Sequence, residues 1–456
     1  MANTWGELTP VLLFSEFRTR LRIKLMRQYT LRILIVMVLL PVTMAAKAYD
    51  FADDGIYYNI ISEEDRTVEV TNRSSGYASY RGNIVIPPKA TSNGITYNVI
   101  TIGYEAFSSC TGLTSIELPE SLTKIGGGAF RNCTGLTSIE LPESVTGIGS
   151  YAFYDCPGLT SIELPEGLTE IGSNVFDGCL GLTSIEFPES LTEIGYEAFC
   201  YCTGLTSIEF PESLTKIGNY AFSDCTGLTS IELPQGVSYI GTTPFNGCEN
   251  LAVIEVSEDN QNFASIDGVL FTKDCSKLLI YPQGKKGKQY IVPNGVATIA
   301  EYSFNEVSEL DSIEFPGSLM EIESSAFVYS KISSVRCKSI APPKATIKAF
   351  NDDVLKGTLY VPVGSKDEYM AVDPWRNFWT IEEVDYSGVG EVTDSDEIFV
   401  IVEGNSITVS GENIGGIEVY SVNGQCVYSG KESVIDGLAK GVYIVKVGSK
   451  TKKVIL

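Results

Sequence analysis

Hydrophobic residues recur along the chain at a step of 23. The segment from Leu113 to Phe130 reads LTSIELPESLTKIGGGAF, and closely similar segments follow one another for more than a hundred residues. The phenylalanine and cysteine columns of this repeat are Phe107, Phe130, Phe153, Phe176, Phe199, Phe222 and Phe245, and Cys110, Cys133, Cys156, Cys179, Cys202, Cys225 and Cys248. A fixed step of roughly 20 to 30 residues is typical of a solenoid, in which each repeat packs only against its neighbours.

Each repeat predicts a short strand with one buried face. Ile116 and Leu118 are apolar and flank Glu117, which alternates to the opposite face. Pro119 ends the strand because proline cannot donate a hydrogen bond to the ladder. Coils stacked at strand spacing, about 4.8 Å, turn every column of identical apolar residues into a continuous seam. The repeat therefore predicts a mainly β solenoid, with short helical turns around Phe130 at the back of each coil.

The repeat consensus LxSIELPESLTxIGxxAFxxCTG resembles that of the BspA-like bacterial leucine-rich repeats. The resemblance extends from residue 50 to about residue 385. It implies a curved, right-handed leucine-rich repeat solenoid with a parallel sheet along one face. Proteins of this family are secreted or attached to the cell surface, and the role usually suggested for them is adhesion to host matrix proteins or to other cells.

The first 48 residues predict export from the cell. A basic segment with Arg27 and Arg32 precedes a short apolar run and the A-x-A cleavage signal of residues 46–48, as in a signal peptide. The run is too short to span a bilayer, so we expect no transmembrane anchor. The true start is either Met1 or Met26, because Met26 lies where a secretory signal normally begins. The alternative interpretation is a buried helix of an intracellular protein.

Atypical units are expected at both ends of the solenoid, because an uncovered end coil would expose its apolar layer. Residues 49–100 read as short strands and hairpins, and we interpret them as an N-terminal β cap to the solenoid of residues 101–385. Residues 358–385 resemble the terminal unit of the family. Three aromatic residues there, Trp375, Phe378 and Trp379, are expected to seal the last coil, although such aromatics also stack on sugars.

The 23-residue step is interrupted once. Phe245 and Phe304 are 59 residues apart, which is one repeat plus 36 residues. Two apolar runs within the excess, 269–271 and 278–281, predict a protruding hairpin in an insertion near residues 257–290. Insertions of this kind often mark a binding face of a repeat array. This one resembles a common variant unit of the BspA-like family, which implies a structural role.

The C-terminal residues predict a small separate domain. Residues 386–397 form an acidic, glycine-containing linker, and residues 398–456 read as a run of strands with an Asn423-Gly424 hairpin turn. The segments 417–425 and 441–447 and the last residues, 450–456, resemble the sorting domain of the type IX secretion pathway. The resemblance implies passage through the outer membrane. The alternative is a small β-sandwich that merely ends the protein.

The charge of the chain excludes several classes of function. Its 33 lysine and arginine residues and 57 aspartate and glutamate residues give a net charge of −24, and histidine is absent. Residues 1–48 carry +5, so the remainder carries −29 and would repel nucleic acid and anionic membranes. The commonest general base and metal ligand is missing. Phosphate loops, nucleophile elbows and zinc-protease motifs do not occur, so we predict a non-enzymatic protein without a cofactor.

The strand face carries a column of acidic residues beside a column of serines. Its members are Glu117, Glu140, Glu163, Glu186, Glu209, Glu232 and Glu255, flanked by Ser115, Ser138, Ser161, Ser184, Ser207 and Ser230. Neighbouring charges about 5 Å apart repel by somewhat under 1 kcal/mol in water, and salt weakens this, so one interpretation is a solvated face. The other is a docking surface for a basic protein segment or for calcium, which prefers carboxylate oxygens. We take this face as the candidate binding site.

Three functions are compatible with this pattern. The first is adhesion of a secreted or cell-surface protein to an extracellular protein or cell-surface ligand through the solenoid face. The second is a structural spacer without a specific ligand. The third is a carbohydrate-capture protein, which an exposed row of aromatic side chains would distinguish from the other two.

Eleven cysteines in an exported chain raise the question of disulfides. Adjacent members of the 23-residue column would have Cα atoms about 5 Å apart, close enough for a bond. Their side chains would nevertheless run parallel into the core, where cysteine is a common apolar filler. We therefore predict buried free thiols and no zinc site. The pattern leaves Cys200, Cys202, Cys275, Cys337 and Cys426 undecided.

Overall fold

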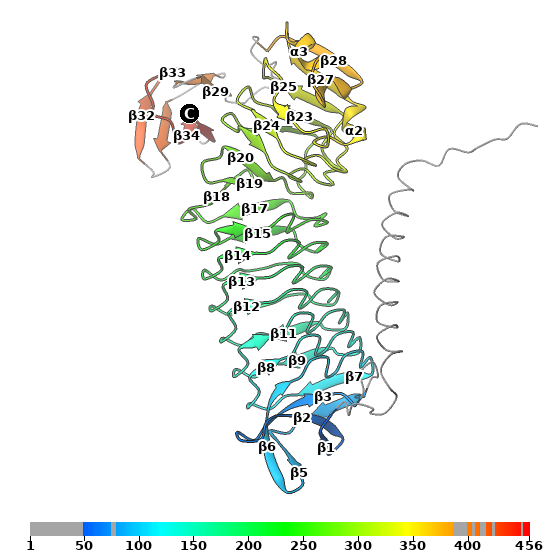
Figure 1. Ribbon diagram of the computed structural model, residues 1–456. Coiled ribbons are helices and arrows are strands. Elements are labelled where there is room, and N and C mark those ends of the chain that lie inside the picture. Colours follow the sequence, from blue (N-terminus) through cyan, green and yellow to red (C-terminus); the bar gives the residue numbers. More distant parts are fainter. Residues whose placement is uncertain are drawn as a thin grey trace, which may run out of the picture. The chain divides into compact units, whose positions relative to one another are not determined.

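The computed structural model of the chain describes residues 49–73, 79–386, 399–403, 406–410, 416–421, 425–447 and 450–456. The predicted signal peptide, with both candidate starts, lies outside the described residues, as do the predicted Asn423-Gly424 turn and almost all of the predicted linker. The structure is mainly β: a solenoid of stacked coils is followed in the chain by two small sheets (Figure 1).

Each coil contributes short strands that pair in parallel with the same strands of the next coil. Ser161 lies beside Ser138 and Glu163 beside Glu140, so the register advances by one repeat. The first strand column contains β7 (Leu113–Glu117), β9 (Ser138–Glu140), β11 (Ser161–Glu163), β15 (Ser230–Leu233) and β17 (Val253–Val256). The second contains β8 (Lys124–Ile125), β10 (Gly147–Ile148), β12 (Glu170–Ile171), β13 (Glu193–Ile194), β14 (Lys216–Ile217) and β16 (Tyr239–Ile240). The predicted mainly β solenoid is confirmed.

The remaining side of each coil consists of hydrogen-bonded turns. In one coil Ala129 N donates to Gly126 O over 3.2 Å, and Cys133 N donates to Phe130 O over 3.1 Å. Phe130 N also donates to Ala152 O of the next coil over 2.7 Å. These turns therefore satisfy their backbone polar groups both within a coil and between coils, as buried backbone must.

The phenylalanine column forms a continuous stack inside the solenoid. Ring centroids of consecutive members from Phe107 to Phe222 are 5.2 to 5.5 Å apart, and Phe222 and Phe245 are 6.0 Å apart. These rings are buried and belong to one hydrophobic cluster that extends from Ile56 to Leu270. Burial of each such side chain contributes about 1.5–3 kcal/mol, so the stack is a main source of stability.

Glycine after the second strand is required by the close approach of neighbouring coils. A Cβ atom on Gly126 would lie 2.7 Å from the carbonyl carbon of Gly103, and one on Gly218 would lie 2.6 Å from that of Gly195. Backbone atoms cannot move away without opening the ladder. At these two positions glycine is therefore required by the spacing of the coils rather than by backbone conformation.

The N-terminal strands are continuous with the first coil. They are β1 (Phe51–Asp53), β2 (Ile56–Ser62), β3 (Thr67–Thr71), β4 (Gly82–Val85), β5 (Lys89–Ser92) and β6 (Ile95–Ile102). Strand β6 lies parallel to β3 on one side and to β8 on the other, and β4 pairs with β7. The edges of the first coil are thereby covered, which removes two edges on which other chains could pair.

An antiparallel meander replaces part of the solenoid in the middle of the stack. It contains β18 (Phe263–Ile266), β19 (Val269–Thr272) and β20 (Lys277–Ile280), and β20 pairs in parallel with β22 (Thr298–Ile299). The predicted hairpin is present as β19 and β20, but it does not protrude, because Leu270, Phe271 and Leu278 are completely buried. Side chains on both faces of β19 are buried because the meander occupies the place of a coil.

Parallel coils resume after the meander. Their strands are β21 (Gln289–Ile291), β23 (Ser312–Phe315), β24 (Glu321–Ile322), β25 (Ser334–Cys337), β26 (Lys344–Ala345), β27 (Thr358–Pro362) and β28 (Thr380–Val384). The aromatic stack begins again with Tyr281 and Phe304, whose ring centroids are 5.0 Å apart, and continues through Phe327 and Phe350. These residues belong to a second hydrophobic cluster.

The last coil is sealed by short helices and by two of the three expected aromatic residues. The helices are α2 (Asp352–Leu355), α3 (Lys366–Met370) and η1 (Trp375–Asn377). Trp375 is completely buried and donates its indole N–H to Pro343 O over 2.8 Å, and Phe378 packs beside it. Trp379 is 74% exposed, so its expected sealing role is wrong. Its backbone N–H donates to Leu355 O over 2.9 Å, and its side chain lies in solvent.

The C-terminal residues form two sheets around a small apolar core. One sheet contains β29 (Phe399–Glu403), β30 (Ser406–Ser410) and β33 (Val434–Ile435), and the other contains β31 (Ile417–Ser421), β32 (Cys426–Gly430), β34 (Val442–Val447) and β35 (Lys450–Ile455). Ile407 and Val409 of the first sheet share this core with Val419 and Val445 of the second. The predicted small β-sandwich is confirmed.

Candidate functional site

The structure places the acidic column where the strand pattern predicts it. Glu163 lies between Glu140 and Glu186 in the parallel ladder, and Glu232 lies beside Glu255. All seven glutamates are exposed, as are five of the six serines, while Ser115 is half-buried. Inward-facing residues of the same strands, such as Ile139, are buried. The strand pairing therefore brings the predicted site residues into two adjacent, solvent-facing columns.

A second acidic column runs along the corner that follows each strand, and the sequence analysis did not identify it. Its members are exposed and repeat at the same 23-residue step: Glu120, Glu143, Glu166, Glu189 and Glu212. Glu166 N donates to Glu143 Oε2 of the preceding coil over 3.1 Å, so at least one of these carboxylates is bonded between coils. The identical step was the available signal. The two glutamate columns together, one beginning at Glu117 and the other at Glu120, form the surface that we name the acidic face.

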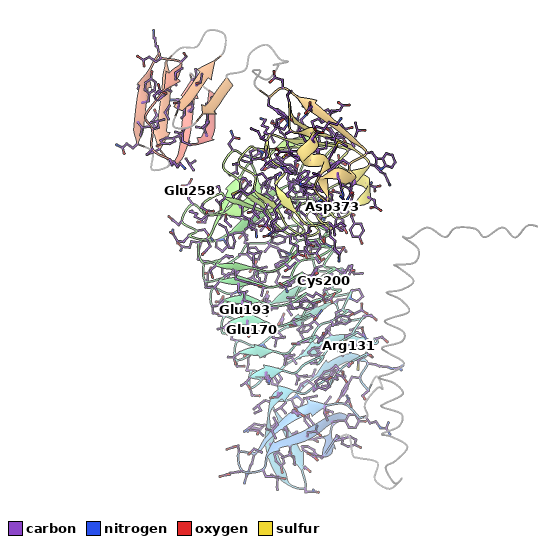
Figure 2. All side chains as sticks on the ribbon, turned by 45° about the horizontal axis from the view of Figure 1, so that its top comes forward. Arg131, Glu170, Glu193, Cys200, Glu258 and Asp373 are labelled. Atoms are coloured by element: carbon purple, nitrogen blue, oxygen red, sulfur yellow. The ribbon has the colours of Figure 1, made fainter. Side chains whose placement is uncertain are left out.

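Few cations lie near the acidic face. Residues 101–256 contain three lysine and arginine residues against twenty aspartate and glutamate residues, a net charge of −17. One of the three cations, Lys216, is paired with Glu193 of the preceding coil at 2.5 Å. Figure 2 shows Glu193 and Glu170 on the same edge of successive coils, with Arg131 and Cys200 on the opposite edge. The field over this part of the solenoid is therefore strongly negative.

The carboxylates of the acidic face are spread along the stack rather than gathered around a point. Within the described part of the chain, no group of three or more histidine, cysteine, aspartate or glutamate side chains is arranged to hold a metal ion. Calcium sites need six to eight converging oxygen ligands. The geometry of the face fits an extended partner better than a single cation.

The equivalent outward column after the meander is not uniformly acidic. The ladder there runs through Ile291, Glu314, Arg336, Tyr360 and Glu382. The carboxylate of Glu314 is paired with Lys338 at 2.6 Å, and the guanidinium of Arg336 lies over the Tyr360 ring, 4.6 Å from its centroid. Glu314 and Arg336 thus contact neighbouring side chains, and the uniform acidic face is confined to the coils before the meander.

The cysteine column has a bonding role that the sequence analysis missed. From Cys133 onward, each thiol donates to the phenylalanine carbonyl oxygen 26 residues earlier, for example Cys156 to Phe130 over 3.0 Å and Cys248 to Phe222 over 3.1 Å. Burial raises the pKa of both these thiols to about 12. Because the thiolate is the reactive form of cysteine, these groups are chemically inert at neutral pH. They are structural and no part of a site.

Exposed tyrosines lie on the turn side of the coils. Tyr104, Tyr196, Tyr201 and Tyr329 are all exposed, Tyr104 to 70%. The ring of Tyr196 meets that of Tyr220 in the next coil edge to face, with centroids 6.0 Å apart. The spacing between most of these tyrosines is irregular because their columns also contain glycine, serine and asparagine. They are scattered aromatic residues rather than the continuous row that would characterise a polysaccharide groove.

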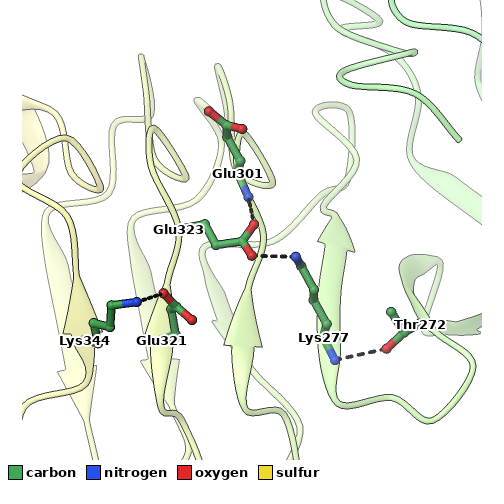
Figure 3. A network of polar contacts seen from close by, with 6 residues as sticks. All are labelled: Thr272, Lys277, Glu301, Glu321, Glu323 and Lys344. Carbon is green, nitrogen blue, oxygen red and sulfur yellow. Dashed lines mark hydrogen bonds and ion pairs between the residues drawn. The ribbon is translucent and has the colours of Figure 1, made fainter.

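A cavity of about 410 Å³ lies where the meander interrupts the stack. Its walls include Phe245 from the coil before the meander, Leu270 and Leu279 from the meander, and Tyr281 and Ser303 from the coils after it. Figure 3 shows polar residues of the adjoining strands, among which Lys277 and Glu323 also border the cavity. The sequence signal was the 59-residue gap between phenylalanines, but the gap does not reveal whether the inserted residues fill the space.

Comparison with known proteins identifies the repeat. The family model described as the BspA type leucine rich repeat region matches residues 89–206, 169–283 and 281–352. A comparison with curated protein sequences gave no significant match. None of the helices in the described part of the chain is long and apolar enough to cross a membrane.

Solved structures share the fold. A leucine rich cell surface protein from Faecalibacterium prausnitzii is 23% identical, with a TM-score of 0.50 over 75% of this chain and 97% of that one. A leucine-rich repeat protein from Bacteroides ovatus is also 23% identical, with a TM-score of 0.51 over 74% of this chain and 100% of that one. The matched repeats and the parallel coils lead to the same conclusion: the chain belongs to the BspA-type leucine-rich repeat proteins.

Proposed function

We propose that this protein is a secreted or cell-surface binding protein, not an enzyme, and that its acidic face adheres to a basic segment of an extracellular protein. Such a segment would belong to a host matrix protein or to a protein of another cell. The observation that carries this proposal is the alignment of exposed glutamates in consecutive coils, with almost no cations among them.

Repulsion within the acidic face is the physical reason to expect a basic partner. Like charges about 5 Å apart repel by somewhat under 1 kcal/mol in water, and the ladder prevents the carboxylates from moving apart. A basic segment would replace this repulsion by attraction, and the negative field would accelerate its approach. Because the strands are already ordered, binding would restrict mainly the partner.

The glutamates recur while another solvent-accessible column of the same coils varies. The variable column consists of Tyr104, Gly127, Ser150, Ser173, Tyr196, Asn219 and Thr242. Simple duplication of a repeat would leave both columns equally uniform. Packing does not require glutamate at an exposed position, so its repetition supports a role in binding.

Absence of catalysis is part of the proposal. The carboxylates of the acidic face occupy equivalent, exposed positions in successive coils. Acid–base catalysis by two carboxyl groups needs environments that differ between them and geometry that converges on one bond. A repeated column supplies neither feature.

Export is also part of the proposal. Its support is the signal-peptide pattern of residues 1–48 and the resemblance of residues 398–456 to the type IX sorting domain. Deletion of residues 398–456 should trap the protein in the periplasm of a producing bacterium with this pathway, whereas the full chain should reach the surface or the medium. Equal export of both forms would leave the C-terminal sandwich as a simple terminal domain.

The binding proposal is tested with the mature chain on immobilised fibronectin, laminin, collagen and fibrinogen. Against any protein bound, we compare a variant carrying Glu140→Gln, Glu163→Gln, Glu186→Gln and Glu209→Gln. We expect binding to weaken strongly, and the binding of the unaltered chain to fall with added salt.

A control with the same change of charge places the substitutions away from the acidic face. It carries Glu258→Gln, Asp259→Asn, Asp367→Asn and Glu368→Gln, all at exposed positions. An equal loss of binding in both variants would show that the effect depends only on the net charge of the protein. Failure of the unaltered chain to bind any of these proteins would favour the structural spacer.

A further inference from the structure

We infer that a hollow beside the exposed Trp379, at the C-terminal end of the solenoid, is a binding site for a sugar unit of a glycan. None of the residues that line this hollow belongs to the acidic face or to the cavity at the meander. The inference therefore goes beyond the proposed adhesion, and either could fail without the other.

The hollow lies beside the helix α2, at the end of the solenoid that also contains β28 (Figure 1). Helix α2 contributes Asp352 and Leu355 to its wall, and η1 contributes Asn377. Phe350, the last phenylalanine of the inner column, also borders it. Its volume of about 430 Å³ lies within the usual range for small-molecule sites, roughly 300–1,000 Å³. Most of its lining residues are exposed, so a ligand can enter from solvent.

Trp379 is fixed by its backbone, but its ring has no partner. Its N–H donates to Leu355 O over 2.9 Å, and the next residue, Thr380, begins β28 beside Thr358 of β27. Within the described part of the chain, its indole N–H forms no hydrogen bond and its ring stacks on neither an aromatic side chain nor a cation. Because the backbone is already ordered, a ligand that covers this ring would restrict little of the protein.

Packing of the last coil does not need the Trp379 ring. Trp375 and Phe378 are buried there, and their ring centroids lie 5.2 and 5.3 Å from that of Phe350. Trp379 is left exposed, and Ile347, which lines the same hollow, is 69% exposed. Single apolar side chains are common on protein surfaces, whereas two that share a hollow are typical of a binding site.

The polar side chains of the hollow are exposed, and two of them are unpaired. Among the described residues, neither the carboxylate of Asp352 nor the side-chain amide of Asn377 has a hydrogen-bond or ion-pair partner. The nearby Lys356 is paired with Asp353 instead, at 2.8 Å. Because Asp352 and Asn377 line the hollow and are exposed, a ligand bound there can reach both side chains.

An aromatic ring beside unpaired polar groups fits a sugar. The C–H face of a pyranose packs on such a ring, while its hydroxyls donate to a carboxylate and both donate to and accept from an amide. A purely apolar ligand would cover Asp352 and Asn377 without bonding them, which is unfavourable. Cation sites built from aromatic side chains enclose the cation in several rings, but Trp379 is the one exposed ring that lines this hollow, and Lys356 there would repel a cation.

The mature chain contains a natural reporter of this hollow. Of its three tryptophans, Trp5 lies in the predicted signal peptide and Trp375 is completely buried. Trp379 is therefore the tryptophan that a neutral quencher such as acrylamide reaches directly in residues 49–456. A sugar that packs on its ring should protect its fluorescence from acrylamide, whereas a sugar bound elsewhere should not.

The test adds maltose, cellobiose, lactose, chitobiose and mannobiose in turn to the full mature chain and follows quenching of its fluorescence by acrylamide. Affinities of the sugars that respond are then measured by calorimetric titration. We expect at least one sugar to protect Trp379. Trp379→Ala should weaken the binding of that sugar at least about tenfold, because the stacking surface is lost. Asp352→Asn should weaken it about three- to tenfold, because an amide accepts sugar hydroxyls less strongly than a carboxylate does.

Two control variants make the same chemical changes outside the hollow. Asp367→Asn alters another exposed carboxylate in the first turn of a short helix, α3, and Tyr329→Ala removes another exposed aromatic ring. Neither should change the affinity for the sugar. Trp379→Ala should leave the melting temperature nearly unchanged because the side chain is exposed, so its loss of binding would not result from unfolding.

Two outcomes would overturn the inference. One is that no sugar protects Trp379, including the case in which choline or an oligolysine peptide protects it instead and so assigns the hollow to a cation. The other is sugar binding that Trp379→Ala and Asp352→Asn leave unchanged, which would place the sugar elsewhere. The four-glutamate variant of the acidic face should bind the sugar normally, so failure of the adhesion proposal remains distinguishable.

Discussion

The coils before the meander and the coils after it share one architecture but differ in their surfaces. Residues 101–256 carry three basic and twenty acidic residues, whereas residues 257–386 carry thirteen and nineteen. Glutamate occupies the outward strand position in all the earlier coils, but isoleucine, arginine and tyrosine share it with glutamate in the later ones. In both blocks the inward phenylalanine column remains. Packing therefore fixes the residue types in the inner columns of the solenoid and leaves those in the outer columns free to vary.

The outer columns therefore carry most of the information about function. A later coil shows that the fold accepts Arg336 or Tyr360 where an earlier coil has glutamate. The two blocks also differ in how their charged side chains are placed. Charged side chains of the later block form ion pairs with one another, such as Glu314 with Lys338, whereas the glutamates of the earlier block are exposed to solvent. The following predictions test whether the two blocks differ in this way.

The largest expected effect comes from removing a ring within the continuous stack. Phe176 stacks between Phe153 and Phe199, at 5.5 and 5.2 Å, so Phe176→Ala should lower the free energy of unfolding by about 3–5 kcal/mol. Phe245 has a stacked neighbour on one side only and borders the cavity, so Phe245→Ala should be less damaging. Amide hydrogen exchange measures each block separately, because a long repeat array does not unfold in two states. Equal losses would show that the stack is not interrupted at the cavity.

A smaller effect should depend on pH and be confined to the earlier block. Burial, assisted by the nearby charges of Glu197 and Asp155, raises the pKa of Asp177 to about 6. The folded chain therefore holds this proton more tightly than the unfolded chain, whose pKa is about 3.8. The contribution of this group to stability is therefore complete below pH 3.8 and is lost as the pH rises through 6.

Asp177→Asn tests this dependence. An amide can still accept the hydrogen bond that Asn174 donates to Asp177 over 3.0 Å, but it carries no buried charge. The variant should be more stable than the unaltered chain at pH 7.5, and the difference should vanish near pH 4. Urea unfolding followed across this range measures it. A constant difference at all pH values would contradict the assigned pKa.

The smallest effect is expected from single charges on the surface, with opposite signs in the two blocks. Glu163→Gln removes a charge that lies between Glu140 and Glu186, so it should raise stability by up to about 1 kcal/mol at low salt, and less at high salt. Glu314→Gln breaks the pair with Lys338 and should lower stability by about 0.2–1 kcal/mol. Thermal melting at two salt concentrations measures both. The same sign for both variants would erase the electrostatic distinction between the blocks.

The architecture could be predicted because the sequence has two periods, one of 23 residues between coils and one of two residues within each strand. The step of 23 places Phe130 on Phe153, and the strand period of two places Glu117 opposite to Ile116, so both columns follow from the sequence. The acidic face follows for the same reason. Identical positions in identical coils must share a surface, whatever the finer geometry.

The expectations that the structure overturns lie where the repeat fails. The run 269–271 forms a strand of the predicted hairpin, but whether that hairpin protrudes or is buried depends on the space left by the missing coil. Trp379 was expected to be buried because of its neighbours in sequence, yet only Trp375 and Phe378 pack into the core and Trp379 is exposed. The cavity depends on how incompletely the meander fills its space, and a position without an equivalent in other coils gives no pattern to extrapolate.

The glycine column has a consequence for how the length of this protein can change. In the coils before the meander, glycines such as Gly126 and Gly218 allow neighbouring coils to approach closely, and each coil ends in the geometry in which the next begins. Insertion or loss of one whole 23-residue unit would therefore move everything beyond it by about 4.8 Å without reshaping either end. Near-identical gene segments exchange unequally in such whole units, so the reach of the molecule is adjustable in discrete steps while both end caps and the cavity stay intact.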